Sequence, residues 1–205
     1  QLLRSGPLSA GLGMTLLVST VIMSTLVVGP FYLSQGLGLG PLAVGLALSA
    51  GPCVAALTGV PAGRLTDRLG SQRMTRAGLG ILLCGALLLS LTSGLIAYLA
   101  ALMILTTGYS LFQAANNTGV MSDVEAARRG TISGLLNLSR NLGLITGASA
   151  MGAVFAFASA TTDIAMAHPE AVATGMRITF AAALALIVVA LAIAFANRAL
   201  ARRME

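Results

Sequence analysis

Residues 176–197 read MRITFAAALALIVVALAIAFAN, a stretch that is almost wholly apolar. About 20 such residues in a helix cross the roughly 30 Å of hydrocarbon in a bilayer. Five further apolar stretches of spanning length precede this one. The predicted spans are residues 10–34, 41–63, 75–92, 94–121, 130–157 and 176–197. The sequence therefore predicts an all-α membrane protein with six transmembrane helices.

The composition excludes a soluble fold. Of the 205 residues, 57% are hydrophobic and only 9% are charged, against roughly 25% charged in soluble domains. A soluble protein of this size needs far more polar side chains on its surface. The net charge of +6 comes from arginine. These arginines lie in the breaks between apolar runs, which argues against nucleic acid as a partner and favours a lipid bilayer.

The arginines follow a pattern along the chain. Ten of the 12 precede the first span, follow the last span or lie in every second break: Arg4, Arg64, Arg68, Arg73, Arg76, Arg128, Arg129, Arg198, Arg202 and Arg203. The breaks at 34–41, 92–94 and 158–175 contain none. Loops with arginine stay on the cytoplasmic side. We therefore expect both termini in the cytoplasm and a multi-pass protein of the cytoplasmic (inner) membrane.

The sequence lacks the groups of residues that form a catalytic or metal site. Cys53 and Cys84 each lie within an apolar run, and no group of His, Cys and carboxylate residues has the spacing of metal ligands. An intramembrane serine protease needs a histidine beside its serine, whereas His168 lies in a break before Pro169. We expect no enzymatic activity, no catalytic residue, no metal and no cofactor.

Small residues and prolines recur within the spans. Three glycine pairs are spaced four residues apart, as in close helix contacts in lipid: Gly59 with Gly63, Gly130 with Gly134, and Gly143 with Gly147. Pro52 and Pro61 interrupt the second span, and proline bends a helix by removing a hydrogen bond.

The basic loop after the second span, residues 63–73, reads GRLTDRLGSQR. Its two glycines permit a tight turn between antiparallel helices. Its acidic residue, Asp67, stands close to Arg64 and Arg68 and can pair with either. The stretch resembles the loop motif of the major facilitator superfamily, on these residues: Gly63, Asp67, Arg68, Gly70 and Arg73. Ser71 stands where that motif usually has a basic residue.

Three further stretches are similar to the 14-span drug:proton antiporter branch of that superfamily, in its C-terminal half. They are FYLSQ at 31–35, followed by Gly40-Pro41 and Gly45, GYSLFQAANN at 108–117 and RGTISGLLNLSRNLG at 129–143. The resemblance implies a polyspecific exporter of small molecules, with a role in antibiotic resistance, driven by proton influx. It also implies two pseudo-symmetric bundles that rock about a central cavity. The loop at Asp67 would then latch onto the other half in one conformation.

The fourth span carries a polar stripe. Thr106, Tyr109 or Ser110, Gln113 and Asn117 recur every three or four residues, with Asn116 beside them. Amides are costly in lipid, so this face should look into the bundle or into water. Two interpretations stay open. The stripe either lines a substrate pathway or makes hydrogen bonds between helices.

The fifth span carries Asn137 and Asn141 on one face, with Arg140 beside them. Arg140 lies about ten residues, or about 15 Å, from the arginine-bearing end of its span, so its side chain can reach toward the headgroups. Ionisable groups within spans are functional candidates, here for conformational coupling or substrate charge. No span has a carboxylate at its middle. The proton-carrying group would lie in another part of the transporter, or coupling would not use protons.

Other readings remain beside export. A major facilitator carrying a metabolite such as a sugar or siderophore fits the same amides and hydroxyls. A half-size protein that works as a homodimer is a third possibility. The chain starts at Gln1 without a signal-peptide pattern. We expect a fragment that lacks an N-terminal half of six or eight helices.

Overall fold

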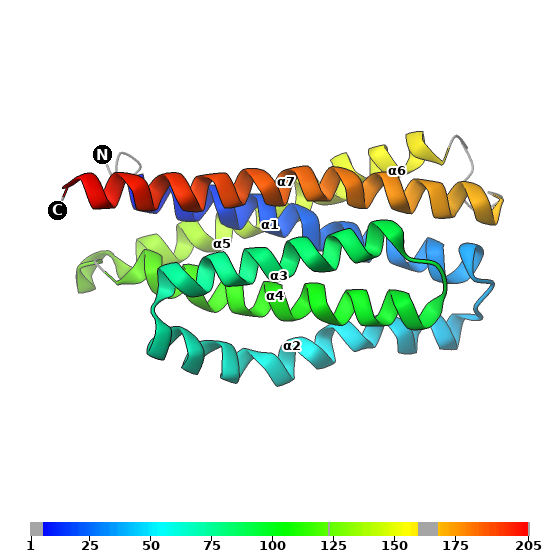
Figure 1. Ribbon diagram of the computed structural model, residues 1–205, viewed down its shortest axis with the longest axis horizontal. Coiled ribbons are helices and arrows are strands. Elements are labelled where there is room, and N and C mark those ends of the chain that lie inside the picture. Colours follow the sequence, from blue (N-terminus) through cyan, green and yellow to red (C-terminus); the bar gives the residue numbers. More distant parts are fainter. Residues whose placement is uncertain (1–5, 123, 160–167, 205) are drawn as a thin grey trace.

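The computed structural model describes residues 6–122, 124–159 and 168–204, with side chains up to Asn197. Within these residues the structure is helical, without strands, and six helices are long and apolar enough to span a membrane (Figure 1). The predicted fold class is confirmed. The first four spans are α1 (Gly6–Phe31) with its π-helical extension η2 (Tyr32–Gly36), α2 (Pro41–Leu69), α3 (Ser71–Leu91) and α4 (Leu95–Met121).

The fifth span is a composite. A short 3₁₀ turn, η3 (Ala126–Arg128), leads into α5 (Arg129–Thr146), the π-helical segment η4 (Gly147–Met151) and α6 (Gly152–Ala158). The sixth span belongs to α7 (Pro169–Met204). The six predicted spans lie within these helices and their π-helical segments, except for Thr92 at the end of the third span and Gly94 at the start of the fourth. The two π-helical segments were not predicted, because nothing in the apolar pattern marks a change of helix type.

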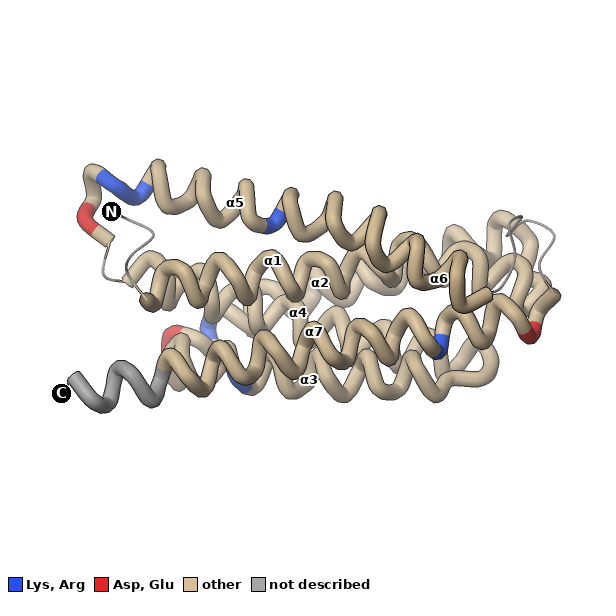
Figure 2. Tube along the Cα trace, turned by 90° about the horizontal axis from the view of Figure 1, so that it is seen from above, with Lys and Arg blue, Asp and Glu red and all other residues tan. Residues whose placement is uncertain are grey.

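The helices run alternately up and down, so that the start of α1 and the end of α7 lie at the same end of the bundle (Figure 1). Most of the basic positions gather at this end, with one midway along α5 and one near the far end of α7 (Figure 2). We call it the arginine-rich end, defined by these residues: Arg64, Arg68, Arg73, Arg76, Arg128 and Arg129. Arg177, two turns into α7, belongs to the opposite end.

The core lies between α1, α3, α4 and α7. Its centre is filled by fully buried side chains such as Val18, Leu82, Leu105, Phe180 and Ile187. The two remaining spans are peripheral. Only 11% of the most apolar window of α2 and 22% of that of the fifth span are buried, against 56% for α1. The main neighbour of α2 is α4, and that of α5 is α1.

Glycines allow α3 and α4 to approach each other closely. A Cβ atom added to Gly78 would lie 2.5 Å from the backbone nitrogen of Phe112, and one added to Gly85 would lie 2.6 Å from the backbone of Leu105. From the opposite helix, Gly108 approaches the backbone of Leu82 just as closely. In lipid, where packing drives helix association, such backbone contact holds the pair together.

Of the three predicted glycine pairs, only Gly143 and Gly147 make a helix contact in this bundle. Added Cβ atoms at these positions would collide with the backbone of α1 at Leu16 and Thr20. The prediction of close helix contacts was wrong, within this bundle, for the pair Gly59 and Gly63 and for the pair Gly130 and Gly134. Added Cβ atoms at Gly59, Gly63, Gly130 and Gly134 would meet no atom within 4 Å, because these glycines lie on the outward faces of α2 and α5.

The turn after α2 is tighter than predicted. Gly63 lies within the helix rather than in the turn, because residues 63–69 continue the helical hydrogen bonding of α2. Gly70 alone joins α2 to α3, with φ at +87°, a conformation that side chains with a Cβ rarely adopt. The helix α2 also continues through Pro52 and Pro61, and Figure 1 shows it bowed along its length.

The α3–α4 contact makes a testable prediction. The Gly78→Val substitution should lower the melting temperature of the purified full-length protein, since overpacking a helix contact costs about 1–3 kcal/mol. Gly80→Val, two residues along the same helix but facing open space, is the matched control and should leave the melting temperature nearly unchanged. Equal effects of the two substitutions would show that the close approach does not stabilise the bundle.

Candidate functional site

Polar side chains from three helices meet in a small hollow midway along the bundle. Its polar walls come from Thr15 and Ser19 on α1, Tyr109, Gln113 and Asn117 on α4, and Arg140 on α5, with Phe112 beside them. The hollow is narrow, about 10 Å³, which is room for about one water. Four of the predicted pathway residues, Tyr109, Gln113, Asn117 and Arg140, thus share one site.

Helix periodicity explains this convergence. Positions 109, 113 and 117 are each separated by four residues, so they stand one above another on the face of α4 that looks toward α1 and α5. Thr15 and Ser19 have the same spacing on α1. Hydrogen bonds fix α5 against α1, because Ser139 Oγ donates to the Leu12 carbonyl at 2.6 Å and Thr20 Oγ1 to the Gly143 carbonyl at 3.0 Å. These bonds orient Arg140 toward the hollow.

Arg140 is the one charged side chain among the described residues that line the hollow. Arg140 is partly buried and makes no ion pair with any described residue. The described acidic residues, Asp67, Glu125 and Glu170, lie at or near helix ends, far along the chain from the middle of a span. A cation that no described carboxylate neutralises, beside a tyrosine and two amides, can bind the carboxylate, phosphate or carbonyl groups of a small molecule.

Asn116 differs from its neighbour Asn117. Its side chain is only 4% exposed, and its Nδ2 donates to the Gly11 carbonyl at 3.1 Å and to Thr15 Oγ1 at 2.9 Å. These bonds join α4 to α1. For Asn116 the structure therefore favours interhelical bonding, whereas Asn117 lines the polar hollow.

Two of the predicted residues lie apart from the hollow. Asn137 and Asn141 are exposed on the outward face of α5, where no described helix covers them. The structure does not bring them together with Tyr109 or Gln113. Amides on an uncovered face within a span need water or a further protein surface, because lipid cannot accept their hydrogen bonds.

A second, larger hollow was not predicted from the sequence. It lies between α1, α2 and α4, measures about 200 Å³, and has mostly apolar walls that include Ile22, Leu48, Pro52 and Leu102. Tyr109 lines both hollows. The Gly51-Pro52 pair was the one signal in the sequence, since a bowed helix leaves room beside its neighbour. Polar and apolar walls thus adjoin at Tyr109.

The loop motif at the arginine-rich end is open. Asp67, Arg68, Gly70 and Arg73 are all exposed. The predicted pairing of Asp67 with Arg64 or Arg68 is not seen among the described residues. Adjacent positions on a helix point apart, and a basic residue ahead of an acidic one has the less favourable orientation.

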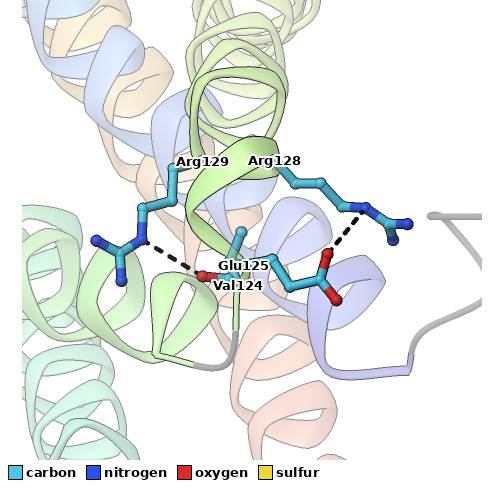
Figure 3. A network of polar contacts seen from close by, with 4 residues as sticks. All are labelled: Val124, Glu125, Arg128 and Arg129. Atoms are coloured by element: carbon cyan, nitrogen blue, oxygen red, sulfur yellow. Dashed lines mark hydrogen bonds and ion pairs between the residues drawn. The ribbon is translucent and has the colours of Figure 1, made fainter.

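The one ion pair within the described residues lies elsewhere at this end. Arg128 Nε is 3.6 Å from a carboxylate oxygen of Glu125, and Arg129 Nε donates to the Val124 carbonyl at 3.4 Å (Figure 3). All these side chains are exposed or near the surface, where such pairs contribute little to stability. They shape the start of α5 and leave Asp67 available for another partner.

Comparison with known proteins now gives the family. The family model of the Major Facilitator Superfamily matches residues 1–148, and the chain belongs to this superfamily of multi-pass membrane proteins. It is 30% identical over 123 residues to the uncharacterized transporter YebQ of Escherichia coli, a match that covers 58% of this chain and 27% of YebQ.

A solved structure shows the same fold. The crystal structure of tetrameric PepTSo2 superimposes with a TM-score of 0.74 at 16% sequence identity, over 96% of this chain and 40% of that one. The chain therefore spans about a quarter of the curated relative and two fifths of the solved structure. Its six helices form a half bundle of the kind found in the superfamily.

The two adjacent asparagines make a testable prediction. Asn116→Ala should lower the melting temperature of the full-length protein, because it removes two interhelical hydrogen bonds worth about 1 kcal/mol in a membrane protein. Asn117→Ala should leave the melting temperature unchanged and alter transport, because Asn117 faces the polar hollow. A stability loss in Asn117→Ala as large as that in Asn116→Ala would contradict this division of roles.

Proposed function

We propose that this chain is the C-terminal half of a secondary transporter that exports small molecules by alternating access, with both termini in the cytoplasm. The observation that carries the proposal is the convergence of Tyr109, Gln113, Asn117 and Arg140 midway along apolar spans. Polar groups at that depth are costly to bury in lipid, so they belong to a pathway for polar or charged groups.

The uncovered helices support a second half. The outward faces of α2 and α5 carry the open glycine pairs at 59 and 63 and at 130 and 134. Small residues at this spacing let another helix approach closely. Asn137 and Asn141 lie on this uncovered side of α5 as well, and lipid cannot satisfy the hydrogen bonds of their amides. An N-terminal bundle of six or eight helices would cover these faces and close a cavity over both hollows.

The adjoining hollows suggest the cargo. The apolar hollow suits the hydrophobic part of a drug-like molecule, while the amides and the tyrosine offer adaptable hydrogen bonds. Together with the resemblance to the drug:proton antiporter branch, this favours polyspecific export driven by proton influx. Because no described carboxylate lies at the middle of a span, the proton-binding residue would belong to the other half.

A second candidate is a carrier of small organic anions. Arg140, which makes no ion pair with any described residue, favours it, since a partly buried cation attracts anionic cargo and repels cationic cargo. The two candidates predict opposite charge preferences for the same site.

Transport in liposomes tests the proposal. With the full-length protein reconstituted under a pH gradient, Arg140→Gln should reduce transport by about tenfold without loss of expression, because it removes a charge-assisted contact to the cargo. Arg177→Gln removes an exposed arginine near the start of α7, at the end of the bundle opposite the arginine-rich end, and this control variant should transport normally. Unchanged transport in Arg140→Gln would remove this residue from the pathway. A panel of cationic, neutral and anionic substrates would distinguish drug export from anion transport.

The loop motif makes a separate prediction. Asp67→Asn should slow transport while leaving the binding affinity for the cargo unchanged, because the proposed latch acts on the conformational change and not on the site. Glu125→Gln removes an exposed acid at the same end and should have little effect. Equal transport rates for the protein and its Asp67→Asn variant would refute a gating role for the loop.

A further inference from the structure

A third hollow lies at the arginine-rich end, outside the proposed pathway. Its volume is about 240 Å³. It lies between the start of α1, the start of α3, the end of α4 and residues 194–197 of α7. Its walls include polar side chains from α3, namely Ser71, Gln72, Thr75 and Arg76, and Asn197 from α7. Arg76 is the one ionisable side chain among the described residues that line it.

Arg76 is held in place but lacks an anionic partner. Its Nε donates to the Gln72 carbonyl at 3.1 Å, and its guanidinium carbon lies 5.6 Å from the centre of the Phe195 ring on α7. The terminal nitrogens of the guanidinium make no ion pair with any acidic residue in the described part of the chain. A fixed arginine with free donors is the usual protein partner of a phosphate group.

The start of α3 adds further donors. No side chain caps this helix, and its first intrahelical bond runs from the Met74 amide to the Gly70 carbonyl at 3.2 Å. The amides of Ser71, Gln72 and Arg73 therefore precede the helical bonding. Free amides and the helix dipole together favour an anion at such an end.

Thr75 gives an independent indication of a ligand. Its side chain is only 7% exposed and lines the hollow, yet its hydroxyl has no hydrogen-bond partner among the described residues. Other buried threonines, such as Thr15, Thr66 and Thr179, donate to the carbonyl four residues earlier. The Thr75 hydroxyl is not among the fully enclosed side-chain atoms that lack a partner, so it opens to the hollow and is free to hydrogen-bond to a group bound there.

We propose that this hollow binds the phosphate group of an anionic ligand, contacted by Arg76, Thr75 and the first amides of α3. The site lies where charged helix ends meet the membrane surface, so the phosphate can come from a lipid headgroup or from a soluble phosphate. A bound phosphate would join α3 to α7 through Arg76 and Phe195. The proposal does not depend on the proposed cargo or on proton coupling.

Thermal-shift titrations of the purified full-length protein test the site. The probes are short-chain phosphatidylglycerol, inorganic phosphate against chloride at equal ionic strength, and short-chain diacylglycerol, which has the lipid tails without phosphate. At least one phosphate probe should raise the melting temperature saturably, and diacylglycerol should not. A shift with phosphatidylglycerol alone identifies a lipid site, and a shift with inorganic phosphate identifies a site for soluble phosphate.

Three variants assign the binding. Arg76→Gln should weaken the affinity for the phosphate probe by about tenfold or more, since charge-assisted hydrogen bonds are the strong ones. Thr75→Val keeps the arginine and should weaken binding by a smaller factor. Arg64→Gln removes an exposed arginine at the same end and should bind normally. The proposal is overturned if no phosphate probe gives a saturable shift, or if Arg76→Gln and Thr75→Val bind as the unchanged protein does.

Discussion

Helices in hydrocarbon associate only where their surfaces fit, and in this chain α1 provides the surface to which α4, α5 and α7 fit. Asn116 bonds to α1 from α4, and Ser139 and Thr20 join α1 to α5. The glycines at 143 and 147 bring the α5 segment against the α1 backbone. Because α1 is itself neutral and more than half buried, it can be surrounded in this way. The polar hollow exists because α4 and α5 meet the same face of α1 with little contact between them.

The bundle is asymmetric as a result. Its tightest pair, α3 with α4, lies on one side with α7, whereas α2 and α5 each have a single main neighbour. The asymmetry leaves the glycine-bearing faces of both peripheral helices uncovered, together with the amides of Asn137 and Asn141. A complete transporter would use these faces for its other half. The same arrangement places the polar and apolar hollows on either side of Tyr109, within reach of one small molecule.

Much of this arrangement could be predicted from the sequence, since spanning length and apolar composition are properties of single segments. The stripe at 109, 113 and 117 followed from helix periodicity alone. The predictions that were wrong or incomplete concern features that depend on the packing of neighbouring helices. Gly63 is of a residue type that is common in turns, but α2 continues through it and ends just before Gly70. Asn116 and Asn117 are identical in type, and only packing against Gly11 and Thr15 separates their roles. The α3–α4 contact was missed because Gly78 and Gly85 are seven residues apart, outside the expected four-residue spacing.

Cysteine labelling in membranes would test the central claim, that the α1–α4–α5 hollow belongs to a water-filled pathway. After Cys53 and Cys84 are replaced by serine, single cysteines at Tyr109, Gln113 and Asn117 in the hollow would be treated with a membrane-impermeant thiol reagent, with the exposed apolar positions Leu88 and Val188 as controls. The account predicts rapid labelling at the first three positions, slowed by transported substrate, and little labelling at the controls. Labelling of all five positions at the same low rate, unaffected by substrate, would contradict it.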